Sequence, residues 1–178
     1  MIAVRAGDLD QLGVLFERHH GPLYGFFVRL TGDRTTSDDL VQLVFYRILK
    51  YRHTYRDEGR FSAWIYHLAR RVAADQYHRA SAGPAATDPN ELHAVPDLAP
   101  DAASRAMSAD DTDRLHAALG RLEPEQRELI VLARFQHLRH DEIARLLNIS
   151  VGNVKVRVHR ALRELRDIYL KLSREPAM

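Results

Sequence analysis

Apolar residues recur at intervals of three and four over the first 80 residues, which is the spacing of amphipathic helices. One helix is predicted to begin at a Ser37 cap and to run from Asp38 to about Tyr51, and a second is predicted over residues 62–79. Glycine and proline, including the pair Gly21-Pro22, are expected at junctions between helices. No strand-like alternation competes, so this block is predicted to be all-helical. The two apolar faces comprise Leu40, Val41, Leu43, Val44, Phe45, Ile48 and Leu49, and then Phe61, Ile65, Leu68, Ala69 and Val72.

A second pattern near the C-terminus predicts a helix that is apolar on one side and basic on the other. Its apolar arc comprises Val151, Val154, Val158, Ala161, Leu162, Leu165 and Tyr169, and its basic side comprises Lys155, Arg157, His159, Arg160, Arg163 and Arg166. A short amphipathic run over residues 141–147 precedes it. Asn148 suits the left-handed end of that first helix, and Ser150 suits the cap of the next. The pattern favours a helix-turn-helix, and the alternative is a two-helix packing motif with a solvated basic face.

Two residues on the basic side are candidate base readers. Val156 is apolar among cations and suits contact with a thymine methyl group, while Asn153 can bond an adenine edge bidentately. The candidate duplex-binding residues are Ser150, Asn153, Lys155, Val156, Arg157 and Arg160.

Aromatic and basic residues interleave on the helix predicted over residues 62–79. Bases of a single strand stack on aromatic rings while arginines hold the phosphates, so this surface is typical of a single-strand binding site. The alternative is that Trp64 and one tyrosine simply pack on a neighbouring helix. The candidate residues of this face are Trp64, Tyr66, His67, Arg70, Arg71, Tyr77 and His78.

The helix predicted from Asp38 also carries a polar stripe opposite its apolar face. Asp39, Gln42 and Tyr46 lie three and four residues apart, so they share one side. Such a stripe is either solvated or serves a protein partner.

Charge divides the chain into three segments. Residues 1–80 carry 12 Lys and Arg against 9 Asp and Glu, residues 81–113 carry 1 against 7, and residues 114–178 carry 13 against 8. The acidic middle segment is also rich in Ala, Pro, Gly and Ser, which predicts a flexible linker. We therefore expect two small helical domains, 1–80 and 114–178, joined by an acidic linker over 81–113.

Composition excludes several other classes. The 178 residues include no cysteine, so disulfides and thiolate metal sites are excluded. No stretch has the roughly 18 consecutive apolar residues of a membrane span, and the first residues lack a signal-peptide pattern, so a cytoplasmic protein is expected. An enzyme would have to use the ten histidines, such as His137 and His140, but no His-Glu-x-x-His, nucleophile elbow or phosphate loop occurs. No cofactor, no metal and no catalytic residue are predicted.

Several motifs resemble those of the bacterial extracytoplasmic-function (ECF) sigma factors. Residues 37–42 are similar to the helix start that grips the β′ clamp helices of RNA polymerase, and residues 61–75 to the helix that binds the minus-ten element. Residues 52–60 align with the loop that holds a flipped promoter base. Residues 122–127 and 142–157 resemble the domain that binds the minus-thirty-five element. The likeness covers most of the chain outside the linker.

The resemblance implies a non-enzymatic protein that directs core RNA polymerase to a promoter and opens the duplex. Its implied partners are the β′ clamp helices and β flap of core RNA polymerase, double- and single-stranded promoter DNA, and an anti-sigma factor. It assigns polymerase binding to Asp38, Asp39, Gln42 and Tyr46. It assigns binding of the minus-ten element to the aromatic and basic face of the helix over residues 62–79. It assigns binding of the minus-thirty-five element to the candidate duplex-binding residues from Ser150 to Arg160.

The departures from the family pattern fall at contact positions. Arg71 stands where the family usually has Asn, and Asn153 and Val156 replace the usual Thr and Ser, so base preference cannot be carried over. Arg139 replaces a common Ser cap, which predicts a weaker cap for the helix that follows. The competing hypothesis is a stand-alone helix-turn-helix regulator, which would bind duplex DNA without polymerase and as a dimer.

Overall fold

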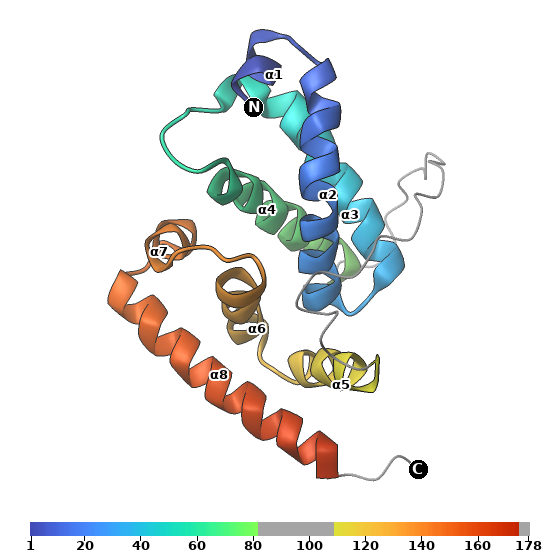
Figure 1. Cartoon of the computed structure of the whole chain (residues 1–178), viewed down its shortest axis with the longest axis vertical. Coiled ribbons are helices and arrows are strands. Elements are labelled where there is room, and N and C mark those ends of the chain that lie inside the picture. The colour runs from blue at the N-terminus through green and yellow to red at the C-terminus, as the bar shows by residue number, and fades with distance from the viewer. Residues whose placement is uncertain (82–108, 175–178) are drawn as a thin grey trace.

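A computed structural model describes residues 1–81 and 109–174, and in these ranges the protein is helical and contains no strand (Figure 1). The prediction of an all-α fold with two small helical units is confirmed. Most of the expected linker lies outside the described residues. The helices are α1 (Ile2–Ala6), α2 (Asp10–Thr31), α3 (Arg34–Tyr51), α4 (Phe61–Ser81), α5 (Ala109–Gly120), α6 (Pro124–Ile130), α7 (His140–Leu147) and α8 (Val151–Arg174), with a 3-10 turn η1 (Arg52–Thr54) and a π-helical turn η3 (Val131–Phe135).

The N-terminal unit is built on α2, α3 and α4. Helix α2 continues through Gly21-Pro22, so the junction expected there is wrong. Packing explains the difference: the helix buries Leu23 and Phe26 almost completely, and such burial outweighs the local helix-breaking tendency of a proline. The apolar faces predicted for α3 and α4 pack in this core.

Helix α3 begins earlier than its predicted cap. The carboxylate of Asp33 accepts hydrogen bonds from the backbone N–H groups of Thr35 and Thr36, at 2.9 and 3.4 Å. Ser37 lies buried inside the helix, where its hydroxyl donates to the Asp33 carbonyl at 2.5 Å. The Ser37 cap is therefore wrong, because an equally suitable capping residue four positions earlier reaches two free N–H groups.

The C-terminal unit begins with α5 at Ala109, inside the segment expected to be linker. Asp110 and Asp111 lie in its first turn, where a helix favours negative charge. Both carboxylates pair with Arg114, at 2.5 and 3.1 Å. These local interactions stabilise a helix start that composition alone had placed in the linker.

Helices α7 and α8 form the predicted helix-turn-helix. Asn148 ends α7 with φ +55°, and the Ser150 hydroxyl accepts a hydrogen bond from the Asn153 N–H at 3.1 Å, as predicted. Arg139 supplies no side-chain cap for α7, although its own N–H donates to Glu142 Oε2 at 2.8 Å. Along α8 the predicted apolar arc is buried at Val154, Val158, Ala161 and Leu165, whereas Val151 is exposed.

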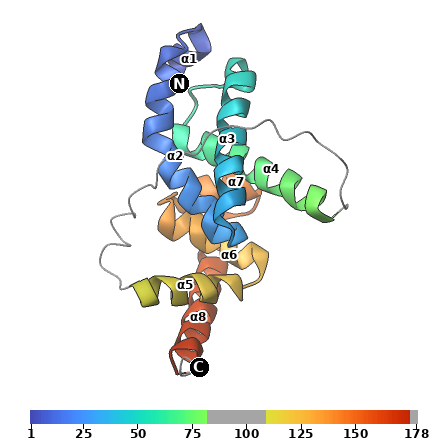
Figure 2. The same cartoon turned by 90° about the vertical axis from the view of Figure 1, so that its right-hand side faces the viewer.

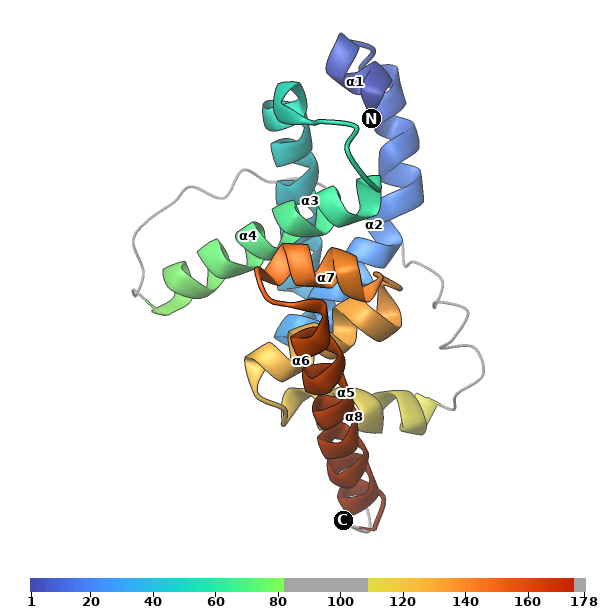
Figure 3. The ribbon, with the colours of Figure 1, turned by 90° about the vertical axis from the view of Figure 1, so that its left-hand side faces the viewer.

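The two helical units pack directly against each other. Helix α2 contacts α5, α6 and η3, and α7 lies across α4 (Figures 2 and 3). Buried residues from both units form one continuous cluster, which includes Phe26 and Leu132. The Arg127 guanidinium donates to the Leu30 carbonyl at 2.7 Å, and that of Arg29 lies 4.2 Å from the centre of the Phe135 ring. Nothing in the sequence predicted this contact.

Candidate nucleic-acid interface

The basic face of α8 is exposed over its first three turns. All six predicted duplex-binding residues lie at the surface, and Val156 is 50% exposed although it is apolar. The Arg157 Nε donates to Asn153 Oδ1 at 2.9 Å, and its Nη1 lies 3.7 Å from Glu125 Oε2. Arg157 therefore orients the Asn153 amide, and this hydrogen bond must rearrange before both ends of the amide can meet a base.

On α4, the predicted single-strand face is only partly at the surface. Tyr77 is 71% exposed, and His67, Arg71 and His78 are also exposed, while Trp64 is half-buried. Burial, followed by the charges of Arg71 and Arg70, lowers the pKa of His67 below its usual 6.5. The imidazole is therefore neutral at physiological pH and can stack or hydrogen-bond without adding charge.

Tyr66 departs from the predicted face. It is 4% exposed, its ring lies 5.2 Å from that of Phe26, and its hydroxyl hydrogen-bonds the Gln136 side-chain oxygen. Burial raises its pKa. Placing Tyr66 on an open face with Trp64 and Tyr77 is wrong in this arrangement, because Phe26 of α2 and Gln136, the residue after η3, pack against it.

Arg70 is engaged by the second unit as well. Its Nε and Nη2 donate to the two carboxylate oxygens of Glu128 at 2.6 and 3.2 Å, and its Nη1 donates to the Leu146 carbonyl at 3.0 Å. A DNA role for Tyr66 or Arg70 therefore stays a prediction, and it requires the two units to separate.

The loop between η1 and α4 is anchored on aromatic rings. The Tyr55 ring lies 5.1 Å from that of Trp64 in an edge-on contact, and its hydroxyl donates to Asp57 Oδ1 at 3.1 Å. The Arg5 guanidinium donates to the Tyr55 carbonyl at 2.9 Å, and Gly59 adopts φ +148°, which favours glycine. These contacts fix the loop beside the exposed part of α4.

The polar stripe of α3 lies on the outer surface of the N-terminal unit. Asp39 is exposed, Gln42 is half-buried and Tyr46 is 60% exposed. Partial burial, and then the charge of Asp39, raises the pKa of the Asp38 carboxyl. The stripe is thus an open surface with two neighbouring carboxylates and one aromatic ring.

Two family models match the chain, sigma-70 region 2 over residues 15–82 and sigma-70 region 4 over residues 112–165. The RNA polymerase sigma factor CarQ of Myxococcus xanthus is 29% identical over 97% of both chains. The ECF RNA polymerase sigma factor SigX of Bacillus subtilis is 29% identical, over 93% of this chain and 86% of that protein. The chain belongs to the ECF sigma factors.

Two solved structures share the fold of this sigma factor. CnrH, in complex with the cytosolic domain of CnrY, superposes with a TM-score of 0.70 at 23% identity, covering 94% of this chain and 92% of that one. RpoE of Bartonella quintana, in complex with the anti-sigma factor NepR, gives 0.66 at 21% identity, covering 94% and 99%.

The match to region 2 includes every residue predicted for polymerase and minus-ten contacts, and the match to region 4 includes the whole reading surface of α8. Sequence reasoning missed the partners that region 4 supplies to α4, namely Glu128, Gln136 and Leu146. No local signal could have found them, because they lie 58 to 76 positions from the residues they bond.

Neither a metal centre nor a membrane span is found in the part of the chain that the structure describes. No three His, Cys, Asp or Glu side chains in residues 1–81 and 109–174 are grouped to hold a metal ion. None of the helices there is both long and apolar enough to cross a membrane. His137 is exposed and His140 half-buried.

Proposed function

We propose that this sigma factor reads its promoter at two separate sites, with α8 on duplex DNA and α4 on the melted strand. The observation that carries the proposal is the exposed start of α8, where Asn153 and Val156 stand among cations on a capped helix of a helix-turn-helix. Such a helix enters the major groove with its first turns against the base edges. Lys155, Arg157 and Arg160 then hold phosphates and position the two readers.

Opening of the duplex is driven by binding to the separated strand. Each base-pair step costs on average about 1.4 kcal/mol of stacking. Stacking on an aromatic ring returns about 1 to 3 kcal/mol per base. Trp64 and Tyr77 supply such rings at separate places along α4, and His67, Arg71 and His78 lie on the side of the helix that carries Trp64. The chain makes and breaks no covalent bond in this scheme.

Polymerase binding is assigned to the α3 stripe. Exposed Asp38, Asp39 and Tyr46 and half-buried Gln42 lie on the side of α3 away from its core, and this surface suits the β′ clamp helices. Region 4 contacts the β flap in the same scheme. This role places the protein in the cytoplasm with RNA polymerase.

The packed arrangement of the two regions is a resting form in this scheme. Arg70 and Tyr66 bond region 4, so they reach DNA only after the regions part. An anti-sigma factor that binds the packed form would hold the protein inactive; the structural neighbour RpoE of Bartonella quintana was solved in complex with the anti-sigma factor NepR.

Run-off transcription on a genomic promoter library tests the proposal. Core polymerase with this protein is expected to initiate at a discrete set of start sites that share two elements. Gel-shift measurements with the protein alone test the competing stand-alone regulator. Tight sequence-specific binding of the free chain, without polymerase-dependent initiation, would overturn the sigma-factor role.

A further inference from the structure

The short helix α1 lies against η1, at the start of the loop over residues 55–60 (Figure 1). From α1, the Arg5 guanidinium donates through Nη1 to the Tyr55 carbonyl at 2.9 Å, a contact that spans 50 positions of the chain. Helix α1 is itself seated in the core by Val4, whose side chain is completely buried. The hydrogen bond therefore ties the loop to the body of region 2.

This tie lies outside the match to the family. The model of sigma-70 region 2 matches from residue 15 onward, so it assigns no role to α1 or to Arg5. The acceptor is a backbone oxygen of Tyr55, the residue at which η1 ends. Arg5 therefore fixes the path of the main chain where the loop begins.

The ring of Tyr55 carries this position to the exposed part of α4. Tyr55 is 4% exposed, and its ring meets the Trp64 ring edge-on at 5.1 Å. The Phe61 ring lies 6.0 Å from that of Tyr55 and 5.8 Å from that of Trp64, so the three rings contact one another. Aromatic contacts at these distances favour particular orientations. A shift of the Tyr55 main chain would therefore change the support of the half-buried indole.

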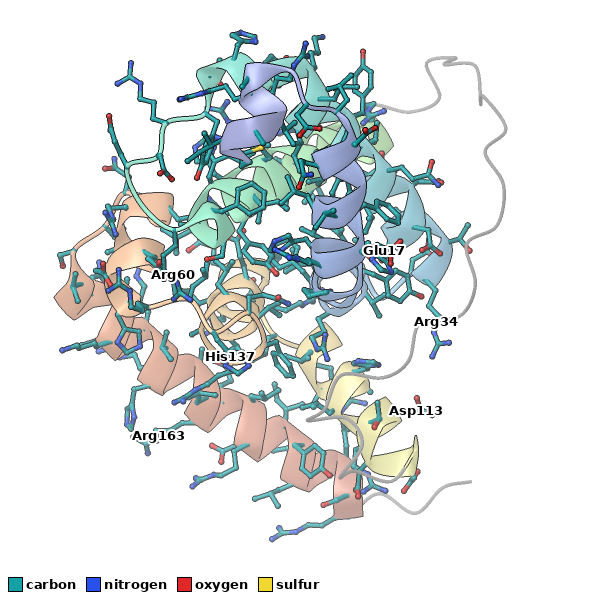
Figure 4. All side chains as sticks on the ribbon, turned by 45° about the horizontal axis from the view of Figure 1, so that its top comes forward. Glu17, Arg34, Arg60, Asp113, His137 and Arg163 are labelled. Atoms are coloured by element: carbon teal, nitrogen blue, oxygen red, sulfur yellow. The ribbon has the colours of Figure 1, made fainter. Side chains whose placement is uncertain are left out.

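The loop depends on contacts from outside itself, because residues 55–60 form neither helix nor strand. Region 4 supplies one such contact, in which Arg60 Nη1 lies 3.8 Å from Glu142 Oε2 (Figure 4). That contact is lost when the two regions separate to bind the promoter. The Arg5 contact lies within region 2 and persists after separation, so it acts in the form of the protein that binds the melted strand.

We propose that Arg5 is a positioning residue for promoter opening. By holding the Tyr55 main chain, it keeps in place the ring that supports Trp64, and so presents the indole to the melted strand in one orientation. Without Arg5 the loop and the indole move more freely, and ordering them becomes an added cost of binding. The inference rests on the proposed binding of the melted strand by α4 and adds to it a residue of α1.

The single tryptophan of the chain, Trp64, reports on this contact in the absence of DNA. Arg5→Met keeps the apolar stem of the side chain and removes its donors, and the fold should be retained because Arg5 is exposed. In this variant, quenching of the tryptophan fluorescence by acrylamide should rise and the fluorescence anisotropy should fall. Arg5→Lys keeps a donor for the carbonyl and should restore most of the wild-type behaviour. Equal melting temperatures in all three proteins would separate positioning from folding.

Promoter opening by the holoenzyme measures the functional effect. With 2-aminopurine in the melted element, Arg5→Met should open the promoter about fivefold more slowly, the change expected from one lost hydrogen bond. Binding of duplex minus-thirty-five DNA should not change, because α8 is untouched. Arg34→Met is the matched control: it removes the same charge from an exposed position at the start of α3, away from the loop, and should open the promoter like the wild type.

The positioning role of Arg5 is overturned if Arg5→Met opens the promoter as fast as the wild type. It is also overturned if the tryptophan of Arg5→Met is quenched no more than that of the wild type, whatever the result with DNA. A wild-type holoenzyme that opens no promoter would instead overturn the proposed function, so the two failures are distinguishable.

Discussion

Arg70 of region 2 and Glu128 of region 4 form a bidentate ion pair, with Nε 2.6 Å from one carboxylate oxygen and Nη2 3.2 Å from the other. The same guanidinium is suited to a backbone phosphate of melted promoter DNA. If Arg70 holds that phosphate, as we propose, then Glu128 of region 4 and the melted strand compete for the same guanidinium.

Glu128→Gln should raise the affinity of the free protein for single-stranded minus-ten DNA. The pair is partly exposed, so its loss should weaken the packing of the regions by about 1 kcal/mol, which corresponds to roughly a fivefold gain in DNA affinity. Fluorescence anisotropy with a labelled oligonucleotide measures the change. Glu17→Gln, an exposed carboxylate elsewhere on α2, is the matched control. Equal affinity in the wild type and Glu128→Gln would show that the ion pair does not limit access.

Substitutions on α8 should separate base reading from phosphate binding. Asn153→Ala is expected to lower discrimination between duplex sequences by about 1 to 3 kcal/mol, because one bidentate base contact is lost. Arg160→Ala should weaken all duplexes alike and reduce the slope of log affinity against log salt by about one. Binding of isolated duplexes at several salt concentrations checks both. A uniform loss in Asn153→Ala would assign that residue to positioning.

The limits of sequence reasoning are visible at Tyr66. Helical periodicity placed α8 and its turn correctly because the caps at Asn148 and Ser150 and the apolar seam depend on neighbours within four positions. The same periodicity put Tyr66 outside the core arc of α4, where Gln136, 70 positions away, in fact covers it. Faces that bury against another domain have no short-range signature, so Arg70 and Tyr66 could be identified as surface candidates but not as interdomain contacts.

The start of α3 illustrates a different limit. Asp33 and Ser37 are both good capping residues, and only the position of the preceding turn selects Asp33. The start of α5 is similar. Composition assigns Asp110 and Asp111 to the acidic linker, whereas in the structure they lie in the first turn of the helix. Local rules supply several candidates for a helix boundary, and contacts within the first turn, such as those of Asp33 and Arg114, decide among them.

Tyr46→Ala should weaken binding to core polymerase without destabilising the fold. Its side chain is 60% exposed, so little core packing is lost. An aromatic residue at the centre of an interface typically contributes about 2 kcal/mol, which predicts roughly 30-fold weaker binding. Tyr77→Ala is the matched control: it removes a tyrosine that is 71% exposed on α4 and should spare polymerase binding while impairing promoter melting. The opposite pattern would move the polymerase surface from α3 to α4.

Mild acid should loosen the packing of the two regions through His116. This residue of α5 is half-buried against α2. Burial, and then the positive charge of Arg29, lowers the pKa of its imidazole below the usual 6.5. The charge of Arg34 also lowers this pKa, whereas the charge of Asp113 raises it. Figure 4 shows Arg34 and Asp113 on the same side of the molecule. When the regions separate, the imidazole regains its ordinary pKa, so the separated form binds the extra proton more readily.

The direction of the pH effect follows from the difference between the pKa of His116 in the packed form and in the separated form. The stabilising contribution of neutral His116 is complete above about pH 6.5 and is lost as the pH falls from there toward the lowered value in the packed form. Scattering measurements should show that the radius of gyration increases as the pH falls from about 7.5 to about 5.5. This increase should be smaller in the His116→Gln variant. Some pH dependence should survive that substitution, because the pKa values of His19 and His67 are lowered as well, chiefly by burial. An expansion of equal size in His116→Gln would assign the effect to those two histidines instead.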